Sequence, residues 1–271
     1  MSNPVAATSV EQMFINHTRA ELLKEPQDTS RLRLRRVKRF MGSMGLRVCD
    51  FRLPPLERAP WVNMKASTLF QPVHDVWGFY QPKIDLAVVY RNHEVEQLNG
   101  CGWTEAILVH ELAHGSGKVV GRSFGFMPAH QDGSRRGTFF EEGFAESMSG
   151  RYIRDALGLR AGFDQKNNGP METKESNGHT LALSNVYCFA ESEATYAWSI
   201  SSLAAMAIDA LTDAQDGLWA TMLASRQDET HLAAVRQRVN SIHPGLYDDL
   251  HSIDNSAEFA AGLHLVQEVL G

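Results

Sequence analysis

The sequence lacks several features that would assign the chain to a specialised class of protein. It contains no run of 18 consecutive apolar residues, so no transmembrane helix is predicted. The opening stretch MSNPVAATSVEQMFINHTRAELL has no basic cluster followed by an apolar run, which argues against a secretory signal and favours the cytoplasm. The three cysteines, Cys49, Cys101 and Cys188, are odd in number and widely spaced, which is typical of reduced thiols rather than of a disulfide framework.

Internal repeats, low-complexity tracts and long linkers are also absent from the 271 residues. Strand-like segments do not alternate with helical segments, which argues against a doubly wound parallel sheet and favours an α+β fold. We expect residues 1–60 to form a basic helical segment that leads into the first strand. Residues 61–160 should carry a small mixed sheet and the candidate site, and residues 161–271 a helical subdomain, all in one compact unit.

Apolar periodicity and turn residues predict the individual elements. A strand is predicted at 45–53, and two short strands within 76–90 around a turn at 81–83, because these stretches are rich in β-branched and aromatic residues. Two polar segments, 121–137 and 162–180, are predicted to be loops. The predicted helices are 10–25, 30–43, 104–114, 138–157, 192–211, 216–227 and 230–242, with a shorter piece after Pro244.

The net charge of −6 conceals an uneven distribution along the chain. Residues 1–60 carry a balance of +5, so the remainder carries −11, and much of the basic excess lies in RLRLRRVKRF at 31–40. This run has two interpretations. It is either a solvated amphipathic helix with Leu32, Leu34, Val37 and Phe40 turned partly inward, or a surface that binds nucleic acid or another anionic partner.

The stretch LVHELAHGSGKVV at 108–120 contains the most informative pattern. His110 and His114 are four residues apart, so on a helix they lie on one face and can share a zinc ion. Glu111 lies beside them and can act as a general base, which completes an H-E-x-x-H arrangement. The alternative is a helix with two surface histidines, but the apolar surroundings make an unpaired charged glutamate costly.

A catalytic zinc requires a third protein ligand. One known continuation, H-E-x-x-H-x-x-G-x-x-H, is excluded because Gly117 matches its glycine but Val120 stands where its histidine should be. Two candidates remain. His130 lies in the glycine-rich loop, and Glu142 lies in the predicted helix that contains FFEEGFAES.

Together, HELAH at 110–114 and EEGFAE at 141–146 resemble the gluzincin branch of the zincin metallopeptidases. The resemblance implies a zincin-like fold with one zinc ion held by His110, His114 and Glu142, and with Glu111 as the base. It also implies that Glu146, four residues after Glu142 on the same helical face, orients His110 through the ring nitrogen that does not bind the metal.

The resemblance further implies where a substrate would lie. Zincins bind a peptide along an edge strand beside the motif helix, and KIDLAVVY at 83–90 is the candidate for that strand, although it also fits a buried core strand. Gluzincins often supply a hydrogen-bond donor for the oxyanion from a later helix. Tyr196 is the first candidate for this role, with Tyr187 and His179 as alternatives, although a tyrosine there also fits simple packing.

These observations lead to two hypotheses about function. The first is a zinc metallo-endopeptidase in which Glu111 takes a proton from the attacking water. The chain lacks a Gly-Ala-Met-Glu-Asn phrase, so aminopeptidase activity is not indicated. The second is a zincin-like regulatory or antirestriction-type protein that cleaves one partner or none and uses the basic run at 31–40 to bind a protein or nucleic acid.

Overall fold

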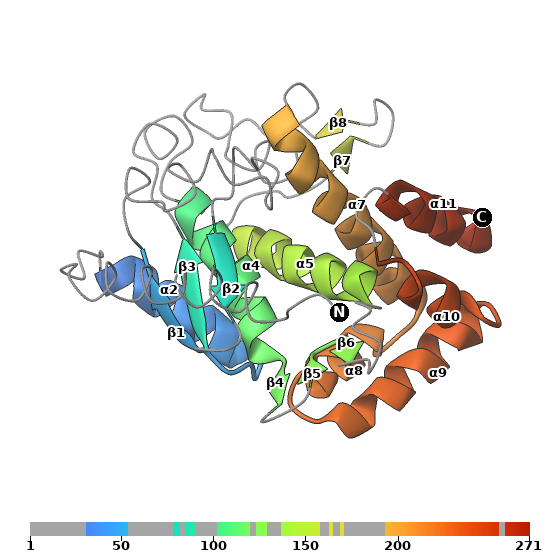
Figure 1. Ribbon diagram of the computed structural model, residues 1–271, viewed down its shortest axis with the longest axis horizontal. Helices are drawn as coiled ribbons and strands as arrows, with labels where there is room; N and C mark the ends of the chain where they lie inside the picture. The colour runs from blue at the N-terminus through green and yellow to red at the C-terminus, as the bar shows by residue number, and fades with distance from the viewer. Residues whose placement is uncertain are drawn as a thin grey trace, which may run out of the picture.

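The computed structural model describes residues 31–53, 78–81, 85–89, 102–119, 123–128, 137–157, 163–164, 169–170, 193–254 and 258–271. Within these ranges the chain is mostly helical with one small mixed sheet, which is an α+β arrangement (Figure 1). The predicted helix at 10–25 lies outside the described residues. No helix in the described ranges is both long and apolar enough to cross a membrane.

Helices α4 (Gly102–Ser116) and α5 (Thr138–Leu157) pack side by side and form the centre of the fold. Helix α4 contacts the sheet and α2 (Arg31–Ser43) as well as α5, and α7 (Glu193–Ala214) packs on α5 (Figure 1). Residues 104–117 are buried without exception, so α4 is a core helix rather than a surface helix. Polar side chains on α4 are therefore held away from bulk water.

The mixed sheet has β3 (Leu86–Val89) at its centre, with β1 (Asp50–Arg52) parallel and β2 (Gly78–Gln81) antiparallel to it. The prediction that 83–90 contains an edge strand is therefore wrong, because β3 is paired on both sides and its four residues are buried. β2 is an edge strand of this sheet, as far as the described residues extend.

The first strand begins later than predicted, and the cap of α2 occupies the first two residues of the predicted span. Gly45 has a φ of 70°, and the amides of Gly45 and Leu46 donate to the carbonyls of Gly42 and Met41. This pair of bonds is a Schellman motif, which uses a left-handed glycine to satisfy the last carbonyls of a helix. Residues 45 and 46 of the predicted strand therefore belong to the end of the helix, and the strand itself is observed at Asp50–Arg52.

The predicted loops also contain short strands. A small antiparallel sheet in and just before the predicted loop 121–137 consists of β4 (Lys118–Val119), β5 (Ser123–Phe124) and β6 (Met127–Pro128). In the predicted loop 162–180, β7 (Phe163–Asp164) pairs with β8 (Gly169–Pro170). Strands of two residues have too little periodicity to be recognised in a sequence.

The C-terminal helices enclose the far end of α5 and α7. They are α8 (Leu218–Ser225), the single 3₁₀ turn η3 (Glu229–His231), α9 (Leu232–Ile242), α10 (Leu246–His251) and α11 (Phe259–Leu270). Two helices, not one, follow Pro244. The second, α11, packs on α7 through a face that includes Phe259, Leu263 and Val266.

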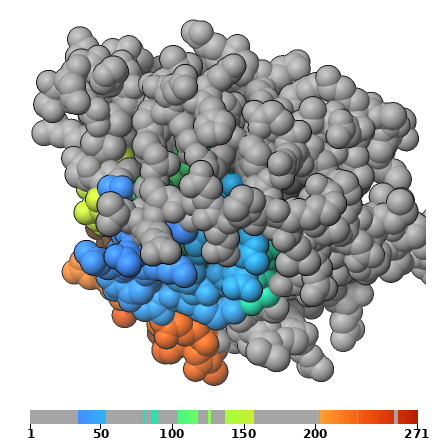
Figure 2. All heavy atoms as spheres, turned by 90° about the vertical axis from the view of Figure 1, so that its left-hand side faces the viewer, coloured from blue at the N-terminus to red at the C-terminus, as the bar shows by residue number. Residues whose placement is uncertain are grey.

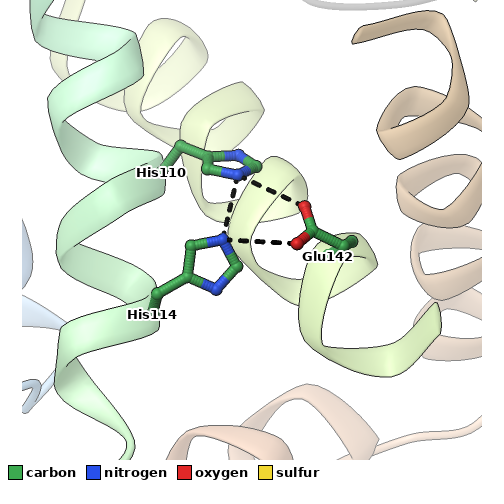
Figure 3. Close-up of side chains that lie close together, drawn as sticks. All are labelled: His110, His114 and Glu142. Carbon is green, nitrogen blue, oxygen red and sulfur yellow. Dashed lines mark hydrogen bonds and ion pairs between the residues drawn. The ribbon is translucent and has the colours of Figure 1, made fainter. Parts of the chain in front are cut away.

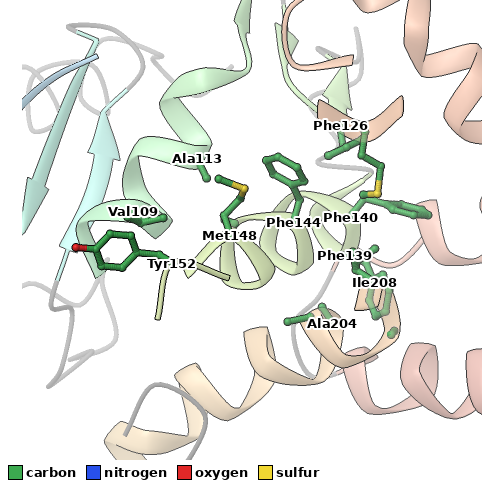
Figure 4. Packing of buried hydrophobic residues seen from close by; sticks show 14 of the residues in the cluster. Val109, Ala113, Phe126, Phe139, Phe140, Phe144, Met148, Tyr152, Ala204 and Ile208 are labelled. Atoms are coloured by element: carbon green, nitrogen blue, oxygen red, sulfur yellow. The ribbon is translucent and has the colours of Figure 1, made fainter. Parts of the chain in front are cut away.

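One hydrophobic cluster connects all these layers, from Val37 on α2 to Val266 on α11. Much of it is aromatic: Phe139, Phe140 and Phe144 on α5 project into the space between α4, α7 and the C-terminal helices (Figure 4). Gly143 allows α5 to approach α7 closely, because a Cβ atom at this position would lie 2.9 Å from the carbonyl oxygen of Ala204 on α7. The glycine of EEGFAE thus has a packing role.

Candidate metal centre

His110 and His114 extend from consecutive turns of α4 toward α5, where Glu142 faces them (Figure 3). Their Nε2 atoms are 3.1 Å apart. The two carboxylate oxygens of Glu142 lie 3.5 Å from His110 Nε2 and 3.7 Å from His114 Nε2. These three side chains therefore direct three ligand atoms toward one point and form a group that could hold a metal ion.

The spacing of the two imidazole nitrogens suits a tetrahedral ion. With metal–nitrogen and metal–oxygen bonds of about 2.0–2.1 Å, the edges of a tetrahedron are about 3.3 Å long. The two Nε2 atoms, 3.1 Å apart, are close to that length, and the Glu142 carboxylate approaches the two rings with different oxygens, at 3.5 Å and 3.7 Å. A cation at the centre could thus reach all three atoms with only small side-chain adjustments.

The other ring nitrogens fix the chemical state of the imidazoles. Nδ1 of His110 lies 2.8 Å from Glu146, and Nδ1 of His114 lies 3.0 Å from Glu141. An ionised carboxylate only accepts hydrogen bonds, so each Nδ1 carries the hydrogen and, in a neutral ring, each Nε2 presents a lone pair. Two lone pairs that face each other beside a carboxylate repel, so either a proton or a metal cation between them stabilises the arrangement.

Burial makes this arrangement electrostatically demanding. Glu141 and Glu146 are fully buried, and His110 is 5% exposed. Burial by itself lowers the pKa of His110, but hydrogen bonds to Glu142 and Glu146 outweigh it and raise that pKa well above its usual value. The site therefore attracts positive charge strongly, as expected for a cation site built from carboxylates and imidazoles.

Glu111 lies beside the two histidines with its side chain against β2. It is 6% exposed, and a Cβ atom at Gly78 would lie 3.0 Å from its Cγ, so the missing side chain of Gly78 makes room for it. Burial raises the pKa of Glu111, although the two histidines oppose this effect. A carboxylate with a raised pKa is better matched to proton transfer near neutral pH.

Two residues that the sequence analysis did not identify complete the centre. Glu141, next to Glu142, bonds to His114, and Arg226 at the end of α8 bonds to Glu141. Because Glu141 directly precedes the candidate ligand Glu142, the sequence could have suggested that Glu141 also contacts the histidines. No local signal distinguishes Arg226, which follows His114 by 112 residues.

The remaining predicted residues are described only in part. Tyr196 lies on α7, but its side chain is outside what the structure describes, as are His130, His179 and Tyr187 altogether. The roles considered for them remain predictions. Helix α7 does reach the centre at Ser201, whose hydroxyl donates to Glu142 across 3.2 Å.

Comparison with protein-family models, curated proteins and solved structures found no match to this chain. The functional argument therefore rests on the residues and their geometry.

Proposed function

We propose that the chain is a zinc-dependent endopeptidase of the gluzincin type with a zincin-like fold. The observation that supports this most directly is the convergence of His110 Nε2, His114 Nε2 and the Glu142 carboxylate into one group that could hold a metal ion. Glu111 stands beside them on α4, as a general base should.

The donor set favours zinc over other common ions. Two imidazoles and one carboxylate suit zinc, whereas calcium and magnesium prefer oxygen ligands alone. Structural zinc sites are closed by four protein ligands, while catalytic sites have three and an open position. Here the side chain of Glu142 is 29% exposed although those of His110 and His114 are 7% and 11% exposed. The Glu142 side is thus the accessible side of the centre.

When bound, zinc would supply Lewis acidity, lowering the pKa of water and polarising a substrate carbonyl. The chain's own groups would handle the protons. Glu111 would take the proton from the attacking water and pass it to the departing amine nitrogen. Glu141 and Glu146 would hold the imidazoles so that both Nε2 atoms face the same point.

We place the peptide substrate along β2 rather than β3. Among the described residues, β2 is an edge strand that contacts α4, and its Gly78 lies against Glu111. An extended peptide paired with this edge would bring a backbone carbonyl past the catalytic glutamate, with backbone hydrogen bonds supplying the affinity.

Metal analysis of the purified chain, paired with an assay on unfolded casein, tests the proposal. We expect about one zinc per chain, cleavage of internal peptide bonds, loss of cleavage with a chelator and recovery when zinc is added back. A chain that binds no zinc would contradict the metal centre. A chain that binds zinc and leaves casein intact would contradict general endopeptidase activity and favour the second candidate below.

The second candidate is a zincin-like regulatory protein that binds nucleic acid through α2. This helix carries six basic and no acidic residues and lies on the face of the molecule seen in Figure 2. Four of its basic residues are exposed: Arg35, Arg36, Lys38 and Arg39. Arginine suits phosphate well because its planar fork donates two hydrogen bonds at once.

Binding of single-stranded and duplex DNA at several salt concentrations tests this candidate. If α2 contacts phosphates, affinity should fall steeply with salt, and Arg35→Ala with Arg39→Ala should reduce the slope of that dependence by about two. Arg236→Ala, an exposed arginine on α9, is the matched control and should leave the slope unchanged. A salt-independent response would rule out phosphate contacts.

A further inference from the structure

Arg226 is a charged side chain that is almost wholly enclosed, with 2% of its surface exposed. It follows the last residue of α8, yet its guanidinium reaches the C-terminal end of α4. All three nitrogens are used. Nη1 and Nη2 donate to the two oxygens of Glu141, Nη2 also donates to the carbonyls of Ala113 and His114, and Nε donates to the Ser116 hydroxyl.

These contacts hold both the backbone carbonyl and the imidazole ring of His114. Nη2 lies 3.2 Å from the carbonyl oxygen of His114 and 2.8 Å from Oε1 of Glu141, and the same Oε1 lies 3.0 Å from Nδ1 of the His114 ring. One guanidinium therefore fixes the backbone of this residue and, through a carboxylate, the plane of its imidazole. Neither Glu142 nor His110 has such a contact with Arg226 among the interactions described above.

From this geometry we infer that Arg226 is a positioning residue of the metal centre, acting through Glu141 to hold His114 Nε2 toward the ion. The inference rests on the proposed metal site and extends it to a side chain from the C-terminal helices. Outer partners of this kind orient a ligand, and their loss typically lowers metal affinity tenfold to a hundredfold.

The surroundings are shaped for a guanidinium. A Cβ atom at Gly117 would lie 2.5 Å from Cζ of Arg226, and one at Gly125 would lie 1.5 Å from Nη1. Gly125 also has a backbone φ of 39°, a value that residues other than glycine rarely adopt. The aromatic rings of Phe144 and Phe126 lie 4.9 Å and 5.5 Å from Cζ. Two glycines and two aromatic rings thus form a close-fitting compartment around one planar group.

A purely stabilising ion pair would explain the burial but not the connection to His114. Arg151 and Asp209 provide the comparison, since they join α5 to α7 at 3.3 Å and Arg151 packs on the Trp219 ring. None of the contacts described for that pair involves a metal ligand. Disrupting it should affect stability alone, whereas disrupting Arg226–Glu141 should also affect the metal.

The test removes each pair without leaving a buried lone charge, because an unpaired charge would itself destabilise the fold. The full-length double variant Arg226→Met with Glu141→Gln is compared with the control Arg151→Met with Asp209→Asn. A single variant, Arg226→Lys, keeps the charge beside Glu141 but cannot reproduce the planar fork. For each, circular dichroism and the melting temperature of the metal-free chain report folding. Zinc affinity by chelator competition and the visible spectrum of the cobalt-loaded chain report the centre.

We expect the Arg226 double variant to bind zinc about tenfold to a hundredfold more weakly and to show an altered cobalt spectrum. Arg226→Lys should lose about tenfold, and the control pair should keep wild-type affinity and spectrum even if it melts earlier. If folded Arg226 variants bind zinc as tightly as the wild type, Arg226 is only a stabilising residue and the inference fails alone. If the wild-type chain binds neither zinc nor cobalt, the metal site itself fails and the inference with it.

Discussion

Glu111→Gln should abolish peptide hydrolysis while leaving zinc binding intact. Glutamine has the size and polarity of glutamate but cannot accept a proton as a base, so turnover should fall by about 10²- to 10⁴-fold. The zinc content and the melting temperature should stay close to the wild-type values, since Glu111 is not among the three side chains that converge on the proposed ion. The measurements are turnover on a peptide substrate, zinc content and thermal melting, all on the same preparation.

A matched control separates this effect from a general loss of charge. Glu268→Gln makes the same change on α11, where the side chain is 67% exposed, and it should leave turnover unchanged. If Glu111→Gln keeps more than a tenth of wild-type turnover, Glu111 is not the general base. If it loses its zinc, the side chain belongs to the ligand set and the division of roles in the motif is wrong.

The helices could be predicted well because their information is local. Helix α5 begins at Thr138 and ends at Leu157, as its apolar periodicity predicts, and α4 extends the predicted span by only two residues at each end. The two candidate ligands on α4 followed from their spacing, since residues four apart on a helix share a face. Glu142, the third ligand that the resemblance implies, is brought opposite them by α5, so the three side chains form a group that could hold a metal ion.

Strand pairing could not be predicted because it depends on contacts between distant segments. The hydrophobic run in 83–90 fits an edge strand and a central strand equally well, and the parallel partner β1 is what makes β3 central. The same reason applies to Arg226. Its contacts with Ala113, His114 and Glu141 link residues separated by 85 to 113 positions, so no local pattern marks it.

Substituting any one of His110, His114 and Glu142 by alanine should greatly weaken zinc binding. Each change removes one of the three proposed protein ligands, so the loss should exceed the tenfold to hundredfold effect typical of outer partners. Zinc that binds only the folded chain also stabilises it by mass action, so adding zinc should raise the melting temperature of the wild type but not of these variants. His264→Ala is the control, because that histidine on α11 is 73% exposed.

Acid should have the same effect as losing a ligand. Carboxylates beside His110 raise the pKa of its imidazole well above the usual value, so the metal-free site holds a proton that zinc must displace. Zinc affinity should therefore be highest in mildly alkaline solution and fall as the pH is lowered through that raised pKa. Chelator competition at several pH values measures this dependence.

The variant Glu142→Ala decides which residue is the third ligand. If it binds zinc like the wild type while His130→Ala does not, the ion is held by His130 and the carboxylate opposite the two histidines has another role.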